Sequence, residues 1–301
     1  MSHAIRVRAF AKINLGLKVL FPRRDGYHEI RTIYQSVSLH DRLKIGLRRG
    51  PGITIDCDDP AVPAGHDNLV YRACEAWRAA RNYAGGVEIE LQKCIPVGGG
   101  LGGGSSDAAA TLMGIERLTG DRLDFPARLR LAASLGSDVP FFLVGGRAIG
   151  CGRGEEIYPL PDLSSRLCVI VHPGIPVSTP EAYRELGLSL TEAREKRNVD
   201  SFGAWSQFSL LDWGPAENDF ERVVFARWPE LGAIKNQFIR AGTETALLSG
   251  SGSAVYAVFD SARKLNQVSR TIPRGWAAFR TRTLRRREFQ RLLFQVSPRR
   301  P

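Results

Sequence analysis

A glycine-rich run near the end of the first third of the chain is the segment best suited to chemistry. It reads Pro96-Val97-Gly98-Gly99-Gly100-Leu101-Gly102-Gly103-Gly104-Ser105-Ser106-Asp107. A strand pattern from Val87 to Leu91 precedes this run, and an alanine-rich helix pattern from Ser106 to Leu118 follows it. Glycine lets the backbone approach a ligand and turn its N–H groups inward, and the N-terminus of a following helix favours negative charge. We therefore predict a phosphate-binding loop, because elements this regular argue against a flexible linker.

Two common phosphate loops do not fit the run. A Walker A loop ends in Gly-Lys-Ser/Thr, and this run contains no lysine. Gly98, Gly100 and Gly103 match the bare dinucleotide pattern, but that match is weak in so glycine-rich a segment. A dinucleotide-binding unit also needs a second strand that ends on an acidic residue, and the stretch from Gly120 to Pro126 is polar and turn-like.

Three motifs in order carry a resemblance to a known family. They are Ala11-Lys12-Ile13-Asn14-Leu15 with Arg24-Asp25-Gly26-Tyr27-His28, the glycine run, and Leu248-Ser249-Gly250-Ser251-Gly252-Ser253-Ala254. With them the chain resembles the GHMP kinases, and its long glycine loop is similar to that of the diphosphocytidyl-methylerythritol kinases. The resemblance implies an α+β fold of two domains with the active site in the cleft between them. An N-terminal ATP-binding domain that is like a ribosomal-protein fold would cover residues 1–160, and a C-terminal α/β domain residues 161–301.

The resemblance also implies an activity and a catalytic pair. Phosphoryl transfer needs a positioned hydroxyl, an acceptor for its proton and neutralisation of charge on the moving phosphoryl group. Asp138, in Gly136-Ser137-Asp138-Val139-Pro140, matches the catalytic aspartate of the family, although an isolated aspartate there would suggest only a turn. Lys12 would pair with it and stabilise negative charge. The implied reaction is ATP-dependent phosphorylation of the 2-hydroxyl of a cytidine-diphosphate-linked methylerythritol, in the non-mevalonate route to isoprenoid precursors.

Ligand-binding residues are carried over from the same family. For ATP they are Asn68, Lys93, Pro96, Gly98, Gly99, Gly100, Leu101, Gly102, Gly103, Gly104, Ser105 and Ser106. For the acceptor they are Asn14 near the sugar alcohol, and Tyr27, His28 and Tyr183 around the cytosine. Mg²⁺ is expected with ATP, and the hydroxyl of Ser105 or Ser106 can reach the metal or a phosphate oxygen. No residue can be assigned as the metal ligand from the sequence.

Other functions remain as alternatives. A sister kinase acting on homoserine, mevalonate or a galactose-like sugar would share the fold and the loop. The formal charge of +11 raises the question of nucleic acid, but eight arginines and one glutamate between Arg280 and Pro301 supply +7 of it, so the basicity is mostly a tail. We expect no nucleic-acid partner. A degenerate kinase that only binds ligands is disfavoured because Lys12, Asp138 and the loop are all present.

The elements that must position these residues follow from apolar spacing. We expect β-structure from Ile5 to Leu47, helices over Asn68–Asn82, Ser106–Leu118, Pro126–Ser134, Pro180–Leu186, Asn218–Trp228 and Glu230–Ala241, and strands over Val87–Leu91, Pro140–Val144, Leu167–Val171 and in a pair between Leu247 and Phe259. Pro159 to Ser165 is the expected linker. Part of the arginine-rich tail should form an amphipathic helix packed on the body, with disordered residues after Ser297.

Composition bounds the remaining properties. The five cysteines are scattered without the spacing of a zinc site or a disulfide framework. No apolar run is long enough to span a membrane and the N-terminus lacks a signal-peptide core, so we expect a cytoplasmic protein that is a monomer or a weak homodimer. The polar stretch from Thr191 to Gly203 matches the family least well, and no role is assigned to it.

Overall fold

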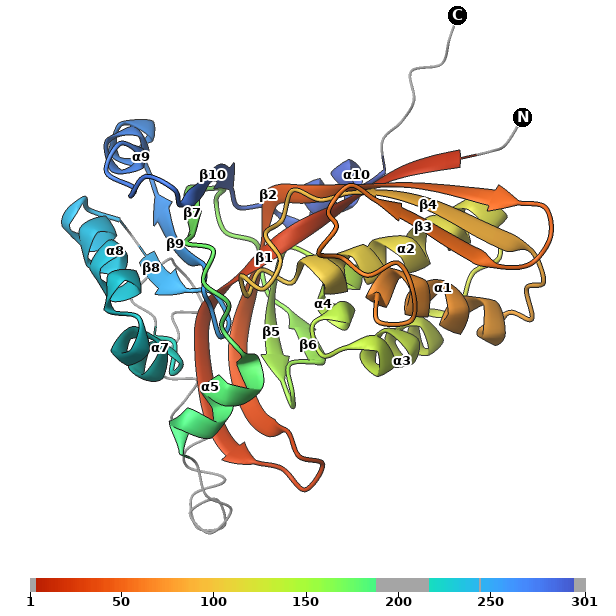
Figure 1. Ribbon diagram of the computed structural model, residues 1–301, viewed down its shortest axis with the longest axis horizontal. Coiled ribbons are helices and arrows are strands. Elements are labelled where there is room, and N and C mark those ends of the chain that lie inside the picture. Colours follow the sequence, from red (N-terminus) through yellow and green to blue (C-terminus); the bar gives the residue numbers. More distant parts are fainter. Residues whose placement is uncertain (1–3, 188–216, 244, 295–301) are drawn as a thin grey trace, which may run out of the picture.

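The computed structural model describes residues 4–187, 217–243 and 245–294. Two lobes share one long β-hairpin (Figure 1). The hairpin consists of strands β1 (Ala4–Pro22) and β2 (His28–Arg48), which pair antiparallel with register shifts between Phe10 and Lys12 and again further along β1. It runs through the middle of the molecule, so residues of β1 lie against both lobes.

The N-terminal lobe is a sheet covered by helices on one face (Figure 1). The sheet has the strand order β3-β4-β2-β5-β6, with β1 also paired to β2. Its other elements are β3 (Ile53–Cys57), α1 (Leu69–Ala80), β4 (Gly86–Gln92), α2 (Gly103–Thr119), α3 (Phe125–Leu135), α4 (Val139–Val144), β5 (Arg147–Cys151) and β6 (Glu156–Pro159). Strand β4 alternates buried and exposed residues, as expected of a strand with one face on the core.

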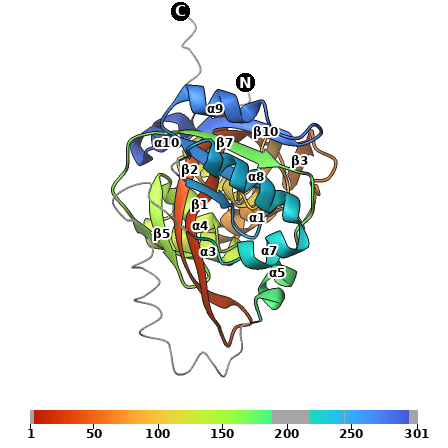
Figure 2. The same cartoon turned by 90° about the vertical axis from the view of Figure 1, so that its left-hand side faces the viewer.

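The C-terminal lobe is built on a four-stranded sheet of order β10-β7-β9-β8. Its elements are β7 (Leu167–His172), α5 (Thr179–Leu186), α7 (Glu221–Arg227), α8 (Pro229–Arg240), β8 (Thr245–Leu248), β9 (Val255–Phe259), α9 (Ala262–Ser269) and β10 (Ala277–Arg282). Helices α8 and α9 contact this sheet, and Figure 2 shows them on the side turned toward the viewer. Among the described residues, no helix has both the length and the apolar character needed to span a bilayer.

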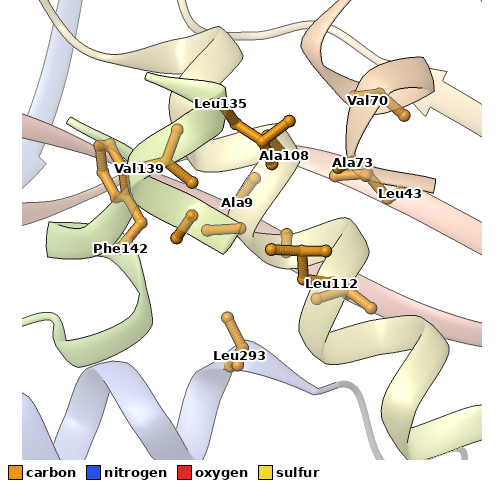
Figure 3. Close-up of a cluster of buried hydrophobic side chains, with 14 of the residues drawn as sticks. Ala9, Leu43, Val70, Ala73, Ala108, Leu112, Leu135, Val139, Phe142 and Leu293 are labelled. Carbon is orange, nitrogen blue, oxygen red and sulfur yellow. The ribbon is translucent and has the colours of Figure 1, made fainter. Parts of the chain in front are cut away.

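The hydrophobic core of each lobe combines residues from distant parts of the sequence. Leu293 of α10 (Arg286–Leu293) belongs to the N-terminal core and approaches Leu112 of α2 (Figure 3). Leu17 and Val19 of β1 belong to the C-terminal core. A third cluster lies between the lobes and contains Leu101 of the glycine loop. Each lobe is therefore completed by residues from the far end of the chain, and the boundary at residues 160 and 161 stays a prediction.

One expected strand is wrong. The run Pro140–Val144 is not a strand but most of helix α4, which begins after Asp138 and ends at Gly145. An apolar run this short fits a buried strand and a buried helix equally well. The flanking residues decide, because Pro140 lies in the first turn of the helix and Gly145 adopts a positive φ of 65° at its end. Val139 and Phe142 pack into the cluster of Figure 3.

Most other expected elements are present where the pattern placed them. The helix in the arginine-rich tail is confirmed as α10, whose Phe289 and Leu293 are buried. The expected linker from Pro159 to Ser165 begins at the last residue of β6 and then runs without regular structure toward β7. The stretch from Thr191 to Gly203 and the residues after Ser297 lie outside the described residues.

Candidate active site

The glycine loop has its carbonyl groups turned toward neighbouring backbone. The carbonyl oxygen of Gly99 accepts from the N–H of Ala254 at 3.2 Å, that of Gly100 from the Ser249 hydroxyl at 3.0 Å, and that of Leu101 from the N–H of Lys12 at 3.0 Å. In a trans peptide unit, the carbonyl and the following N–H point in opposite directions. The N–H groups of residues 100–102 are therefore turned away from these contacts.

A pocket of about 260 Å³ lies at this loop. Its lining includes every residue from 95 to 104, with Asn68, Lys93 and Asp107. Within the part of the chain that the structure describes, no group accepts a hydrogen bond from the N–H of Gly100, Leu101 or Gly102. A row of free backbone donors followed by the N-terminus of helix α2 is an anion-binding arrangement.

The loop is held by close packing as well as by hydrogen bonds. Gly100 has a φ of +72°, and a Cβ at this position would lie 2.0 Å from the carbonyl oxygen of Ser249. Glycine is thus required twice, by backbone conformation and by the approach of a second backbone segment. Leu101 interrupts the glycines because its side chain is 1% exposed in the core between the lobes.

The third sequence motif forms the opposing loop, from Ser249 to Ala254. Asn218 anchors it by donating from Nδ2 to the carbonyl oxygens of Leu248 and Gly250 at 2.9 and 2.7 Å. A Cβ at Gly250 would lie 3.4 Å from Nζ of Lys12, so this loop also reaches the first motif. All three motifs therefore meet at one place, where β1 crosses between the lobes.

Lys12 and Asp138 face each other beside the glycine loop. Nζ of Lys12 lies 3.5 Å from Oδ2 of Asp138, and the side chains are 4% and 29% exposed. The Tyr34 hydroxyl donates to Oδ1 of Asp138 at 2.9 Å. A Cβ at Gly102 would lie 3.2 Å from Cγ of Lys12, which places the lysine stem against the loop. The carboxylate thus lies beside a cation, within reach of a group bound at the loop.

A buried polar chain supports this pair from within the hairpin. Nζ of Lys12 donates to Oδ1 of Asn14 at 2.8 Å, and Nδ2 of Asn14 donates to the Thr32 hydroxyl at 2.8 Å. Thr32 in turn donates to the carbonyl oxygen of Gly16 at 2.7 Å. Asn14 is 1% exposed. The side-chain amide of Asn14 therefore orients the ammonium of Lys12, which the sequence did not predict. The expected contact of Asn14 with the sugar alcohol stays a prediction.

Three of the expected acceptor residues lie near the turn that joins β1 to β2. The rings of His28 and Tyr183 are stacked, with centroids 4.6 Å apart and an interplanar angle of 14°. Burial raises the pKa of Tyr183, and the negative charge of Asp138 adds to the shift, so the phenol is within electrostatic reach of the carboxylate. Burial lowers the pKa of His28 and favours its neutral form. Tyr27 does not face Tyr183 but lies under the guanidinium of Arg153, 4.7 Å from Cζ to the ring centroid.

Lys93 is engaged inside the protein. Its ammonium lies 2.5 Å from Oδ2 of Asp41 and 2.7 Å from Oδ2 of Asp107, and its side chain is 7% exposed. Burial lowers the pKa of Lys93, but the charges of Asp107 and Asp41 outweigh burial and leave the pKa above its ordinary value. Burial, with the charge of Asp41, raises the pKa of Asp107 to about 8. Lys93 lines the loop pocket, and its contact with a nucleotide stays a prediction.

The other expected ATP residues divide into buried and accessible ones. Ser106 is 2% exposed and donates its hydroxyl hydrogen to the carbonyl oxygen of Phe10 at 2.7 Å. Ser105 is half-buried, and its hydroxyl would lie 3.9 Å from a Cβ at Gly136, near the segment that leads to Asp138. Asn68 caps α1 by accepting from the N–H of Val70 at 2.8 Å, which explains its residue type without a ligand.

Several supporting residues escaped the sequence pattern. Tyr34, Asp41, Asn218 and His172 all lie at the motifs, and none of them belongs to a recognisable motif of its own. The ring of His172 lies against Gly99, with Cδ2 3.1 Å from where a Cβ would stand. Its Nε2 is buried and has no hydrogen-bond partner among the described residues. A polar residue within an apolar strand, as in Thr32–Ser36, is a sequence signal for a supporting residue of this kind. Such a signal does not show which residue the polar side chain contacts.

A metal site made by protein ligands alone is not evident in the described part of the chain. No three His, Cys, Asp or Glu side chains come together there in a way that could hold a metal ion. Mg²⁺ in phosphoryl-transfer sites is held by substrate phosphates, water and one or two carboxylates, so such a site does not require a group of three.

Comparison with known proteins gives consistent matches over most of the chain. Family models for the GHMP kinases N terminal domain and the GHMP kinases C terminal match residues 68–146 and 190–278. A protein of Solibacter usitatus named 4-diphosphocytidyl-2-C-methyl-D-erythritol kinase is 46% identical over 88% of this chain and 84% of its own length. A crystal structure of 4-(cytidine 5'-diphospho)-2C-methyl-D-erythritol kinase matches with a TM-score of 0.74 and 34% identity, over 93% of this chain and 99% of the other.

The structure is also similar to that of a kinase named for another acceptor. The crystal structure of homoserine kinase from Cytophaga hutchinsonii matches with a TM-score of 0.69 over 95% of this chain and 96% of the other, at 19% identity. At that identity the likeness concerns the fold alone. The fold thus does not separate the two acceptor classes, whereas the sequence identities do.

Proposed function

The chain belongs to the GHMP kinases and, among them, to the 4-diphosphocytidyl-2-C-methyl-D-erythritol kinases, and from this membership we propose how its residues carry out the reaction. It is an ATP-dependent kinase whose acceptor is 4-diphosphocytidyl-2-C-methyl-D-erythritol. The observation that carries the proposed mechanism is the ion pair of Lys12 and Asp138 beside a loop with free backbone N–H groups.

The glycine loop binds the phosphates of ATP. The N–H groups of Gly100, Leu101 and Gly102 donate to phosphate oxygens, and the N-terminus of α2 adds its partial positive charge. The accessible Ser105 hydroxyl is better placed to reach a phosphate oxygen than that of Ser106, which is already bonded to Phe10. Because this loop is held by the opposing loop and by β1, its donors are fixed before ATP arrives.

Asp138 and Lys12 act on the acceptor hydroxyl. Asp138 accepts the proton as the hydroxyl oxygen bonds to the γ-phosphorus, and the bond from that phosphorus to the bridging oxygen breaks, so that ADP leaves. Lys12 neutralises charge on the transferring group and on the carboxylate. The Tyr34 hydroxyl occupies Oδ1 of Asp138 and leaves Oδ2, on the side of Lys12, for the incoming proton. We place the reacting group at the 2-hydroxyl of the sugar alcohol.

The acceptor's cytidine end lies at His28 and Tyr183, with Tyr27 at the rim. Two stacked rings and a half-exposed tyrosine offer flat surfaces of the kind that hold a base. The paired placement of these residues, rather than any one ring, favours a cytidine-linked acceptor over homoserine or mevalonate.

Mg²⁺ bound together with ATP would supply neutralisation of the phosphate charge. We assign the metal no protein ligand. Chelation with EDTA should abolish turnover, and added Mg²⁺ should restore it. Full turnover in EDTA would contradict this part of the proposal.

The test is a panel of acceptors. ADP release is measured with ATP, Mg²⁺ and each of 4-diphosphocytidyl-2-C-methyl-D-erythritol, homoserine, mevalonate and galactose. Phosphorus NMR of the product identifies which hydroxyl is phosphorylated. Turnover confined to the cytidine-linked compound, at its 2-hydroxyl, is the expected result. Phosphorylation at another hydroxyl would contradict the placement of the sugar alcohol against Asp138.

A further inference from the structure

Asp41 lies beneath the glycine loop, at the centre of a buried cluster of charges. Its side chain is fully buried, and those of Lys93 and Asp107 are 7% and 2% exposed. Asp41 comes from β2, the strand that pairs with β1, β4 and β5. A charged side chain this deep in the protein costs stability unless its partners are well placed. Its contacts are therefore informative about what it holds.

One set of contacts fixes the entry to the loop. Oδ1 of Asp41 accepts from the N–H of Cys94 at 2.5 Å and from the N–H of Ile95 at 2.8 Å. These two residues directly precede the loop, so the direction in which the chain leaves β4 depends on this carboxylate. Two backbone donors on one carboxylate oxygen form a strong, directional contact.

The second set reaches the exit from the loop through Lys93. Oδ2 of Asp41 accepts from Nζ of Lys93 at 2.5 Å, and the same nitrogen donates to Oδ2 of Asp107 at 2.7 Å. Asp107 lies in helix α2, which begins where the loop ends. Nζ of Lys93 would also lie 3.4 Å from a Cβ at Gly103, the first residue of that helix.

We infer that Asp41 is a positioning residue of the ATP site, which holds both ends of the glycine loop at a fixed separation. The entry is held by its Oδ1 and the exit by its Oδ2 through Lys93 and Asp107. Neither Asp41 nor Asp107 needs to touch the nucleotide. Fixed loop ends keep the N–H groups of residues 100–102 aimed at one place, so ATP binding does not have to order the loop.

This arrangement also gives Lys93 a role besides a direct contact with nucleotide. An ammonium that already donates to Asp41 and Asp107 is neutralised by Asp41 and is poorly suited to serve as a free counter-ion for phosphate. Its two short contacts instead join strand β2 to helix α2 across the base of the loop. The inference rests on the proposed binding of ATP phosphates by that loop, and it makes the effect of the cluster indirect.

The test compares Asp41→Asn with a change in a second buried ion pair, which lies on helix α2 away from the loop. Asparagine keeps an oxygen for the two backbone N–H groups but loses the charge that holds Lys93. The control is Glu116→Gln, because Glu116 is 3% exposed, accepts from Arg128 and from the N–H of Leu123, and lies near the opposite end of α2. The affinities for Mg-ATP and for the cytidine-linked acceptor are measured by titration calorimetry, and folding by circular dichroism and thermal unfolding.

Asp41→Asn should weaken Mg-ATP binding about tenfold and leave acceptor binding within about twofold, as expected of one lost charge-assisted contact. Glu116→Gln should lower the melting temperature without changing either affinity. Asp107→Asn leaves a neutral Asp41–Lys93 pair, which favours folding, and should weaken Mg-ATP binding by about threefold.

The inference would be overturned if folded Asp41→Asn bound Mg-ATP as tightly as wild type, or if it lost affinity equally for both ligands. The proposed function would still stand in either case, provided that the wild-type protein turns over the cytidine-linked acceptor. If Asp41→Asn does not fold, unchanged Mg-ATP affinity in Asp107→Asn would overturn the inference. A wild-type protein that bound no Mg-ATP would overturn the proposed function itself.

Discussion

Nζ of Lys12 and Oδ2 of Asp138 lie 3.5 Å apart, although the two residues come from opposite ends of the N-terminal lobe's sequence. Lys12 is held in β1 by its backbone contact with Leu101 and by Asn14, whereas Asp138 stands at the start of α4 and is held by Tyr34. Lys12 thus has partners of its own, whereas the ring of Tyr34, the partner of Asp138, also lies 5.6 Å from Nζ of Lys12. Removing one member should leave the other and the loop in place.

Asp138→Asn should reduce kcat by a factor of about 10² to 10⁴, because an amide cannot take the proton of the acceptor hydroxyl. The KM values for ATP and for the acceptor should change little, since neither the loop nor the rings is altered. Steady-state kinetics with each substrate varied in turn measures the split. Asp260→Asn, an exposed aspartate paired with Lys264, is the control and should behave as wild type. Wild-type turnover in Asp138→Asn would remove this residue from the mechanism.

Gly100→Ala should abolish most ATP binding. The added methyl would meet the Ser249 carbonyl oxygen at 2.0 Å and force the two loops apart. Gly120→Ala is the matched control, because Gly120 has a similar φ of +76° at the end of α2 but nothing within 4 Å of its Cβ position. The control carries only the backbone strain, about 1 kcal/mol in unfolding free energy, and should bind ATP normally. Equal ATP affinities in the two variants would show that the contact between the loops does not matter.

How far the sequence predicts this molecule depends on whether a feature is local. The glycine loop is a local feature, because the glycines that allow its sharp turns and the residues that begin the following helix are adjacent in the sequence. Its anchoring is not, since Asp41 precedes Cys94 by 53 residues and nothing in either neighbourhood marks the contact. Motif resemblance supplied Lys12 and Asp138, and the structure then brought them to one place.

The misplaced strand has a similar origin. Pro140–Val144 is apolar at every position, so it has no periodicity that could separate a strand from a helix. Pro140 and Gly145 favour a helix, and this helix then packs against α2 and α3. Because this segment is a helix, Asp138 lies at the start of a helix and not at the start of a strand, and its side chain faces Lys12.

The charged cluster below the loop should make stability depend on pH above neutrality. The pKa of Asp107 is raised to about 8 by burial and by the charge of Asp41, whereas an unfolded aspartate ionises near pH 4. The folded state therefore holds a proton that the unfolded state has lost. Its stabilising effect is complete below about pH 4 and is lost as the pH rises through about 8. Between pH 7 and 9 the loss should be on the order of 1 kcal/mol in unfolding free energy.

Asp107→Asn cannot titrate and should lack this slope. Urea unfolding of both proteins at pH 7 and 9 measures the difference, and subtraction removes the contribution of groups common to both. The variant leaves Lys93 paired with Asp41 alone, which is a neutral pair. Parallel pH profiles in the two proteins would mean that Asp107 is already ionised at pH 7.

Tyr27→Ala should raise the KM for the cytidine-linked acceptor about 5- to 100-fold and leave the KM for ATP nearly unchanged. The range corresponds to about 1 to 3 kcal/mol for the stacking of one base on one aromatic ring. Tyr27 is 51% exposed and is covered by Arg153 on one side, so its ring is accessible without rearrangement of the core. Tyr158→Ala is a close control, because Tyr158 is 54% exposed and lies on β6. The base would not stack on the ring of Tyr27 if both variants raised the KM for the acceptor equally, or if Tyr27→Ala raised the two KM values equally. His28 and Tyr183 alone would then have to hold the base.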